Sequence, residues 1–421
     1  MDAAAASPCL AAASANPPTT RAAPRVLRPV SDTRNSLSPM TTSALPPDAV
    51  RRLRLRAQGL APRRDLTPAG VVGHMIALQG QDLPAVLRAI AIRSRPGTTV
   101  DDVRAAFDAG EIVRGWTQRG TLFATTPRDL AALCSLTAQR VSHSMRRIRE
   151  TEGLDDAVIR DAAAVAREAL ADGGVSRATL MDLWRQAGVP VEGQRGYHLI
   201  VQLALEGMLH WGPFAGTQQL MVATPAPSSS GGGNPPAPGA PEQELRRIAR
   251  AYFATRGPAT ADDLAWWLGL PRTPVRKVVA ELRSGGADSP PDALRTITVR
   301  DVADAGTAEL LADPGLLDPG PGDPEPSSSA TAPAVVTLVP GFDETVLGYQ
   351  DRAFVASKEA MKTVVPFTNG VFRPAVLLDG RLVGTWRRAP KKDEPPFELI
   401  PGIPARDQEA IARAVASWDL A

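Results

Sequence analysis

Apolar residues recur at helical spacing along the middle of the chain, and a stretch of alternating residues follows them. Residues 155–171 and 194–209 fit helices by this spacing, and Ser176 is placed to cap a helix over 177–187. In 209–224, apolar positions alternate around Gly-Pro and Gly-Thr turn signals, which predicts a β-hairpin. Three helices followed by a hairpin are typical of a winged helix-turn-helix unit.

The same order of elements recurs after residue 241. A helix is predicted over 242–255, and Thr260 is placed as the N-cap of the next helix, DDLAWWLG. A third helix over 272–283 and a strand over 294–299 complete this second copy of the pattern.

A less regular copy occupies the first third of the chain. Helices are predicted over 48–58, 68–79 and 99–109, and the alternating segment IVRGWTQRGTLFAT over 112–125 predicts strands. The three copies together predict three winged helix-turn-helix domains in tandem.

The last part of the chain has a different pattern. The segments TLVPGF, NGVFRPAVLLDGRLVGTWRR and PFELIPGI are strand-rich and carry Asn-Gly and Asp-Gly turn dipeptides. We therefore expect a small β-barrel or sheet closed by a helix over 405–417.

Breaks in composition separate these regions. Residues 225–241, PAPSSSGGGNPPAPGAP, read as a flexible linker, and the stretch around 312–333 combines Pro, Gly and acidic residues as a loop does. Residues 1–39 are rich in Ala, Ser, Pro and Arg, a composition also found in transit peptides, and we interpret them as a disordered extension. The predicted fold is α+β, with these parts: 1–44 disordered extension, 45–135 first winged helix, 136–224 second winged helix, 225–241 linker, 242–333 third winged helix with an acidic Pro/Gly loop, 334–421 C-terminal β-barrel.

Composition excludes several kinds of site. No run of about 18 apolar residues occurs, which argues against a spanning helix. The chain has only 2 cysteines and 4 scattered histidines, so we expect no disulfide framework, no metal and no cofactor. We expect a cytoplasmic protein of several domains.

The net charge of +2 does not by itself indicate a nucleic-acid partner, but the distribution of arginines is uneven. At helical spacing, Arg52 and Arg56 share one face, and Arg140 and Arg147 share another, with Arg146 beside them. A solvated helix surface explains most charge runs of this kind. Several winged-helix units in one chain favour contacts with DNA phosphates instead.

The segment GHMIALQGQDLPAV, residues 73–86, carries the candidate chemistry. On a continuous helix Gln79 and Gln81 would point about 200° apart, so both face one pocket only if the helix ends here. Gly80 would supply that bend, and Pro84 can open the following helix. The alternative, which the residues alone favour, is that Gln79 caps the helix while Gln81 and its neighbour face solvent.

Separate motifs in the same order carry a family resemblance. They are LQGQD (78–82), WTQRGTLF (116–123), YFATRGPATADDLAWWLGL (252–270), PGFDETVLGYQDR (340–352) and NGVFRPAVLLDGRLVGTWRR (369–388). By these motifs the chain, from residue 49 nearly to its C-terminus, resembles the AlkZ-type family of winged-helix DNA glycosylases. The resemblance implies three tandem winged helices and a C-terminal β-barrel arranged around DNA.

The family's catalytic motif has Gln, any residue, then Gln or, in another branch, Asp. The resemblance therefore implies that Gln79 and Gln81 are the catalytic residues. One position departs from the pattern, because the family's RGTLH motif ends in His and this chain has Phe123 there.

Other residues of these motifs are expected near the lesion or on DNA, although structural roles compete for most of them. Arg119 is expected at a phosphate or the lesion, with a strand surface as the alternative. Trp266, Trp267 and Cys134 read most simply as core, and Asp343 and Tyr349 as a structural polar network. The expected lesion pocket comprises Asp82, Trp116, Arg119, Thr121 and Phe123, and the expected DNA contacts are Arg52, Arg56, Arg140, Arg146, Arg147, Arg352 and Arg373.

The function that follows is hydrolysis of the N-glycosidic bond of alkylated purines, above all cationic N7-alkylguanine and its bulky or crosslinked adducts. No lysine nucleophile stands out, so a monofunctional enzyme without a Schiff base is expected. Its partner would be double-stranded DNA containing alkylated bases, with no membrane, and the protein would be a monomer. The alternative is a non-enzymatic winged-helix DNA-binding protein, a regulator or a damage-binding shield, and self-resistance against a genotoxic metabolite stays open.

Overall fold

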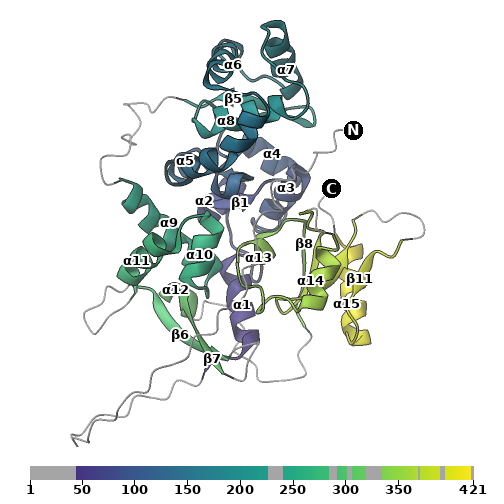
Figure 1. Ribbon diagram of the computed structural model, residues 1–421. Helices are drawn as coiled ribbons and strands as arrows, with labels where there is room; N and C mark the ends of the chain where they lie inside the picture. The colour runs from purple at the N-terminus through teal and green to yellow at the C-terminus, as the bar shows by residue number, and fades with distance from the viewer. Residues whose placement is uncertain are drawn as a thin grey trace, which may run out of the picture.

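The computed structural model describes residues 44–225, 240–283, 292–300, 306–318, 334–367, 370–388 and 394–418, and it mixes helices with antiparallel sheets. Figure 1 places one helical unit at the top, a second at the lower left and the C-terminal sheet at the lower right. The strand β1 lies where these parts meet. All but the last residue of the expected extension over 1–44, most of the linker 225–241 and most of the loop 312–333 fall outside the described residues.

The first unit begins with helices whose starts are fixed by local capping. Thr67 accepts a hydrogen bond from the N–H of Gly70, and Thr99 forms a capping box with Asp102. The elements are α1 (Pro47–Ala57), α2 (Pro68–Met75), β1 (Ala77–Gln79), α3 (Leu83–Ala91), α4 (Val100–Asp108), β2 (Val113–Trp116) and β3 (Leu122–Thr125).

The second unit follows a helix of 25 residues, α5 (Pro127–Thr151). Ser176 caps its helix by accepting from the N–H of Thr179, as the sequence predicts. The remaining elements are α6 (Asp156–Ala169), α7 (Arg177–Gln186), α8 (Arg195–Leu205), β4 (Leu209–Ala215) and β5 (Gln218–Ala223). The β4–β5 hairpin joins the strands of the first unit in one five-stranded sheet, in the order β1-β3-β2-β4-β5.

The third unit repeats the order of helices and hairpin. Thr260 forms a capping box with Asp263, which confirms the predicted start of the second helix of this unit. Its elements are α9 (Ala240–Arg256), α10 (Ala261–Leu268), α11 (Arg272–Leu282), β6 (Arg295–Arg300), β7 (Thr307–Ala312) and the short α12 (Pro314–Leu317).

The C-terminal region is an open antiparallel sheet, and the expected β-barrel is wrong. Its order is β11-β10-β9-β8, and in the described part of the chain the end strands β8 and β11 do not pair. The helix α15 packs on the sheet instead, where the rings of Trp386 and Trp418 lie 4.6 Å apart. The elements are β8 (Val336–Val339), α13 (Glu344–Leu347), α14 (Lys358–Val364), β9 (Ala375–Leu378), β10 (Arg381–Trp386), β11 (Phe397–Leu399) and α15 (Ala405–Ala416).

Separate hydrophobic cores hold these parts together. The first unit and the C-terminal sheet share one core, in which Val72, Phe107 and Leu377 are buried. The second unit has its own core around Trp184. A third core joins the third unit to the first, because Ile76 beside β1 packs in the same cluster as the helices α9 to α11.

Two structural features are absent from the described residues. No helix there is both long and apolar enough to cross a membrane. Within the same residues, no three His, Cys, Asp or Glu side chains gather as a metal site would require.

Candidate active site

The segment that carries the two glutamines is extended, and the predicted helix over 68–79 is wrong beyond residue 75. The helix α2 ends at Met75, and Ile76 adopts φ 63° and ψ −50°, outside the helical region. The chain then pairs antiparallel with β3, where Ala77 lies opposite Thr125 and Gln79 opposite Phe123. Pairing with a strand 40 residues away thus overrides the local helical spacing.

The chain stays paired with β3 for one residue beyond β1. The N–H of Gly80 donates to the carbonyl of Leu122 at 2.7 Å. The strand itself ends at Gln79, and the chain bends at Gln81 and Asp82. The helix therefore ends earlier than predicted, and the alignment of Gln79 and Gln81 on one pocket stays a prediction.

Gly80 permits close packing at this position. A Cβ at this position would lie 3.1 Å from the backbone nitrogen of Ala124 and 3.2 Å from Cδ of Arg114. The missing side chain lets β1 approach β3 and Arg114, whose Nη1 donates to the Gly80 carbonyl at 3.0 Å.

The two glutamines differ in their surroundings. Gln79 is 7% exposed, and its Oε1 lies 3.5 Å from the hydroxyl of Thr121, at the limit of a hydrogen bond. Gln81 is half-buried, and within the described residues its Oε1 is buried without a hydrogen-bond partner. A buried carbonyl oxygen without a partner calls for an explanation, and a bound water is one.

Asp82 has a structural task. Its carboxylate accepts from the N–H of Ala85 at 2.9 Å and so caps α3, with Pro84 in the first turn. The cap expected of Gln79 at the end of the preceding helix is wrong, because α2 ends at Met75 with Ile76 in the capping position. This aspartate is exposed, and contact with a lesion stays a prediction.

A buried ion pair binds the free edge of β1. Glu344 accepts the backbone N–H of Gln79 at 3.0 Å, and its other oxygen accepts from Arg256 at 2.9 Å. Arg256 also donates to the carbonyls of Met75 at 3.0 Å and Ala77 at 2.7 Å. Both residues stand in motifs that carry the resemblance, but nothing in the sequence indicated that they meet.

Arg114 lies beside this strand. Burial lowers its pKa to about 10, so the guanidinium stays charged at neutral pH, and the carboxylate of Asp82 opposes that shift. Its Nε is buried without a partner in the described part of the chain.

The QRGTL segment is a tight turn between β2 and β3, not the strand surface considered for Arg119. Arg119 has φ 58°, and its guanidinium lies 4.3 Å from the ring centroid of Trp266. Arg352 approaches the same ring at 5.3 Å. Burial lowers the pKa of Arg119 to about 10, and both arginines stay protonated at neutral pH. This places Arg119, expected at the lesion, beside Arg352, expected on DNA.

Other residues of the expected lesion pocket are in cores. Trp116 is 3% exposed and packs near the rings of Tyr197 and Trp211. Phe123 is fully buried, and its ring meets Trp267 edge-on at 6.4 Å. Their contact with a lesion stays a prediction, as it does for the buried Thr121.

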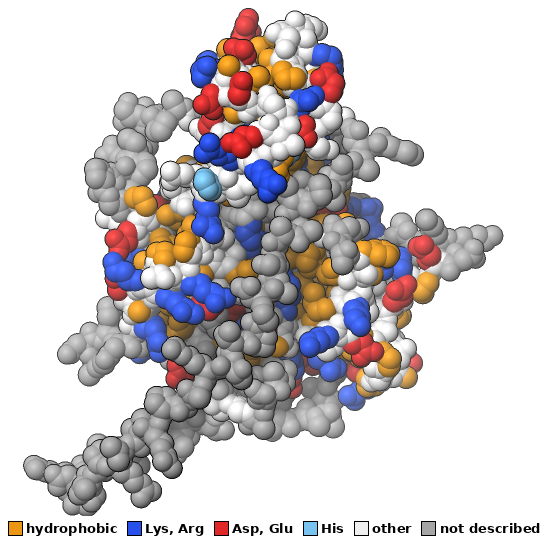
Figure 2. All heavy atoms as spheres, viewed as in Figure 1, with side chains coloured by type: hydrophobic (Ala, Val, Ile, Leu, Met, Phe, Trp, Pro, Cys, Tyr) orange, Lys and Arg blue, Asp and Glu red, His pale blue; other side chains and the backbone are white. Residues whose placement is uncertain are grey.

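The arginines expected on DNA differ in accessibility. Those on α5, Arg140, Arg146 and Arg147, are exposed, and Arg146 pairs with Glu150 at 2.8 Å. Figure 2 shows basic side chains where the upper helical unit meets the rest of this face, with acidic ones mixed in toward its tip. On α1, Arg52 is exposed, and Arg56 donates to the carbonyl of Asp318. Arg373 is half-buried, 5.9 Å from the ring of Phe367.

The structural interpretations of the remaining candidates are confirmed. Asp343 forms a buried pair with Arg93, at 2.8 Å for both oxygens, and Tyr349 donates to the carbonyl of Arg256 at 2.9 Å. Cys134 contacts the carbonyl of Trp116, and burial raises the pKa of its thiol to about 12.

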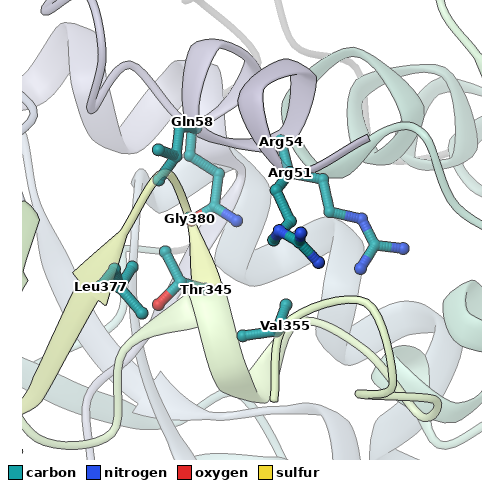
Figure 3. Close-up of a pocket in the computed structure, with 8 residues that line it drawn as sticks. Arg51, Arg54, Gln58, Thr345, Val355, Leu377 and Gly380 are labelled. Atoms are coloured by element: carbon teal, nitrogen blue, oxygen red, sulfur yellow. The ribbon is translucent and has the colours of Figure 1, made fainter. Parts of the chain in front are cut away.

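A small cavity lies between α1 and the C-terminal region (Figure 3). Arg51, Arg54 and Gln58 line it from α1, and Thr345, Val355, Leu377 and Gly380 from the other side. Neither Gln79 nor Gln81 contributes to its wall.

The sequence and the fold of this chain are similar to those of known DNA glycosylases. The family described as DNA glycosylase AlkZ-like matches residues 72–419. An interstrand DNA cross-link repair glycosylase of Streptomyces sahachiroi is 25% identical over 345 residues, which cover 79% of this chain and 85% of that protein. The solved structure of the DNA glycosylase AlkZ from the same organism superposes with a TM-score of 0.66 at 22% identity, covering 89% of this chain and 96% of that one. The chain belongs to the AlkZ-like family of DNA glycosylases.

Proposed function

We propose that this protein hydrolyses the N-glycosidic bond of alkylated purines in duplex DNA, with cationic N7-alkylguanine as the main class of substrate. The observation that carries the proposal is the pair of side-chain amides at the end of the edge strand β1, with Gln79 in the strand and Gln81 two positions further on. The partnerless Oε1 of Gln81 would accept a hydrogen bond from the attacking water.

Hydrolysis of a cationic N7-alkylguanine nucleotide can be catalysed by uncharged side-chain amides. A guanine alkylated at N7 already carries a positive charge, so the electron pair of the C1′–N9 bond leaves with a base that becomes neutral. The enzyme has to stabilise the oxocarbenium-like sugar and hold a water at C1′. Two amide carbonyls supply negative dipoles for both tasks, and the proton of the water passes to solvent.

A lysine nucleophile is not part of the proposal. The lysines in the described residues, Lys277, Lys358 and Lys362, are exposed on α11 and α14 and not on the sheet that holds the glutamines. We therefore propose monofunctional hydrolysis by water without a Schiff base.

We further propose that the three helical units act as winged helices within the predicted domain boundaries, with the exposed arginines of α5 on the phosphates. The relative named for interstrand cross-link repair supports bulky or crosslinked N7-guanine adducts as substrates of this chain too. Such adducts make complete base flipping costly, so a site on a sheet edge suits them better than a deep pocket.

The test is incubation of the purified protein with a duplex containing one N7-methylguanine, followed by quantification of abasic sites. We expect release well above the spontaneous rate, and none above it for the Gln79→Ala/Gln81→Ala double variant. Equal abasic product from both proteins would refute the assignment. Binding of undamaged DNA with strong sequence preference and no base release would support the non-enzymatic alternative. Phe123, where the family motif has His, is the main argument for a third possibility, an inactive structural relative.

A further inference from the structure

The strand β1 stands at the edge of its sheet, so one row of its backbone groups has no neighbouring strand. Gly80 bonds toward β3, which leaves the carbonyl of Ala77 and the N–H of Gln79 on the outer side. Arg256 donates to that carbonyl at 2.7 Å, and Glu344 accepts that N–H at 3.0 Å. The ion pair thus takes the place of a neighbouring strand, because Arg256 supplies the donor and Glu344 the acceptor that the backbone of such a strand would supply.

We infer that Arg256 and Glu344 are positioning residues that set the place of Gln79 in the active site. The inference rests on the proposed function. Neither residue would touch the substrate, because both are at most 1% exposed. Their effect on base release would pass through the backbone of β1.

The pair also holds the abrupt change from helix to strand. Ile76 is β-branched and has φ 63°, a conformation that such residues adopt only when their surroundings enforce it. Arg256 donates to the carbonyl on each side of it, from Nη1 to Met75 and from Nη2 to Ala77. The guanidinium therefore keeps the turn that directs Gln79 and Gln81 along the sheet edge.

The pair is itself fixed by parts of the chain remote from β1. Arg256 ends α9 and Glu344 begins α13, and the two are 88 positions apart. Trp267 donates from Nε1 to Glu344 at 3.1 Å, and Tyr349 donates to the carbonyl of Arg256. The third unit and the C-terminal region thereby determine where the first glutamine lies.

The adjacent residue provides a matched control. Asp343 forms an equally buried pair with Arg93, both side chains 1% exposed, but none of the hydrogen bonds of that pair reaches β1. Both carboxylates use both oxygens. Glu344→Gln and Asp343→Asn each replace one accepting oxygen by an NH2 group. In both variants this NH2 group faces a hydrogen-bond donor, so the local disturbance is of the same kind.

The experiment compares single-turnover base release and DNA affinity for these two variants, at a temperature where both are folded. We expect Glu344→Gln to slow release by roughly 10- to 100-fold with DNA affinity unchanged, since small misplacements of reacting groups have effects of this size. Asp343→Asn should stay within about threefold of the wild type. Equal slowing by both variants, or by neither, would overturn the inference while wild-type activity stands.

A second measurement does not depend on activity. Hydrogen exchange of the peptide covering 76–81 should be faster in Glu344→Gln than in Asp343→Asn, because only the former frees the N–H of Gln79. Should Glu344→Gln fail to fold, Arg256→Lys and Arg93→Lys form the equivalent comparison. An inactive wild type would refute the proposed function, whereas equal exchange in the two variants would refute the positioning role.

Discussion

Truncation of Gln81 to alanine should lower the rate of base release without lowering the stability of the fold. Its Oε1 is buried and has no hydrogen-bond partner in the described residues, so the folded protein bears the desolvation cost of that carbonyl.

The magnitude follows from two opposing contributions. A buried polar atom without a partner costs ~1–3 kcal/mol, which Gln81→Ala recovers. The variant loses the burial of one methylene, Cγ, at ~0.8 kcal/mol, and less than that because the side chain is only half-buried. We therefore expect Gln81→Ala to be at least as stable as the wild type, with a free energy of unfolding higher by up to ~2–3 kcal/mol.

The loss of activity should be large by comparison. Removal of one preorganised group that acts on developing charge typically lowers the rate by ~100- to 1000-fold. The assays are urea unfolding and single-turnover release of N7-methylguanine, with Gln186→Ala, at an exposed position on α7, as the control that should alter neither. A Gln81→Ala protein that is destabilised by several kcal/mol, or that keeps near wild-type release, would refute the reasoning.

Further predictions concern the sheet, the pH dependence and DNA. Phe123→His should destabilise the protein by ~2 kcal/mol or more in urea unfolding, because a polar ring would replace a fully buried phenyl against Trp267; an unchanged midpoint would contradict this packing. Gly80→Ala should lower both stability and base release, since its Cβ would lie 3.1 Å from the backbone of β3, and wild-type values for both would show that the strands separate freely. Burial lowers the pKa of His74 to about 4, so the unfolded chain binds a proton at this residue more readily than the folded protein does. The free energy of unfolding should therefore fall as the pH drops from about 6.5 toward 4, and it should fall less in His74→Gln. Arg147→Glu should weaken DNA binding and reduce the slope of log affinity against log salt concentration by about 1 or more. Arg167→Glu on α6 should leave the slope unchanged, and equal slopes for the two variants would show that α5 does not contact DNA.

Sequence reasoning predicted the elements whose causes are local. Ser176 and Thr260 cap the helices that their spacing indicates, and the hairpin over 209–224 forms around its turn residues. In these cases the side chain and the backbone group that it satisfies are only a few positions apart. Pattern and structure therefore agree.

The two incorrect predictions, a helix that continues over residues 76–79 and a closed C-terminal barrel, share a different cause. The stretch from Met75 to Gln79 is a short apolar run, which suits a helix or a strand equally, and β3 decides the outcome from 40 or more residues away. Closure of the C-terminal sheet likewise depends on whether its two end strands meet, which no local pattern specifies. The sequence did indicate the two glutamines, through a family motif, but the ion pair that holds their strand joins residues 88 positions apart.

The affinity of the protein for a mimic of the reacting sugar tests the role of the two amides most directly. A duplex with a cationic pyrrolidine in place of the deoxyribose carries the charge of the oxocarbenium-like state, and a tetrahydrofuran duplex of the same shape does not. We expect the wild type to bind the charged duplex tighter by roughly 100-fold or more, as transition-state analogues are bound, and the Gln79→Ala/Gln81→Ala variant to lose most of that preference. The same preference in both proteins would show that the glutamines do not stabilise the sugar cation.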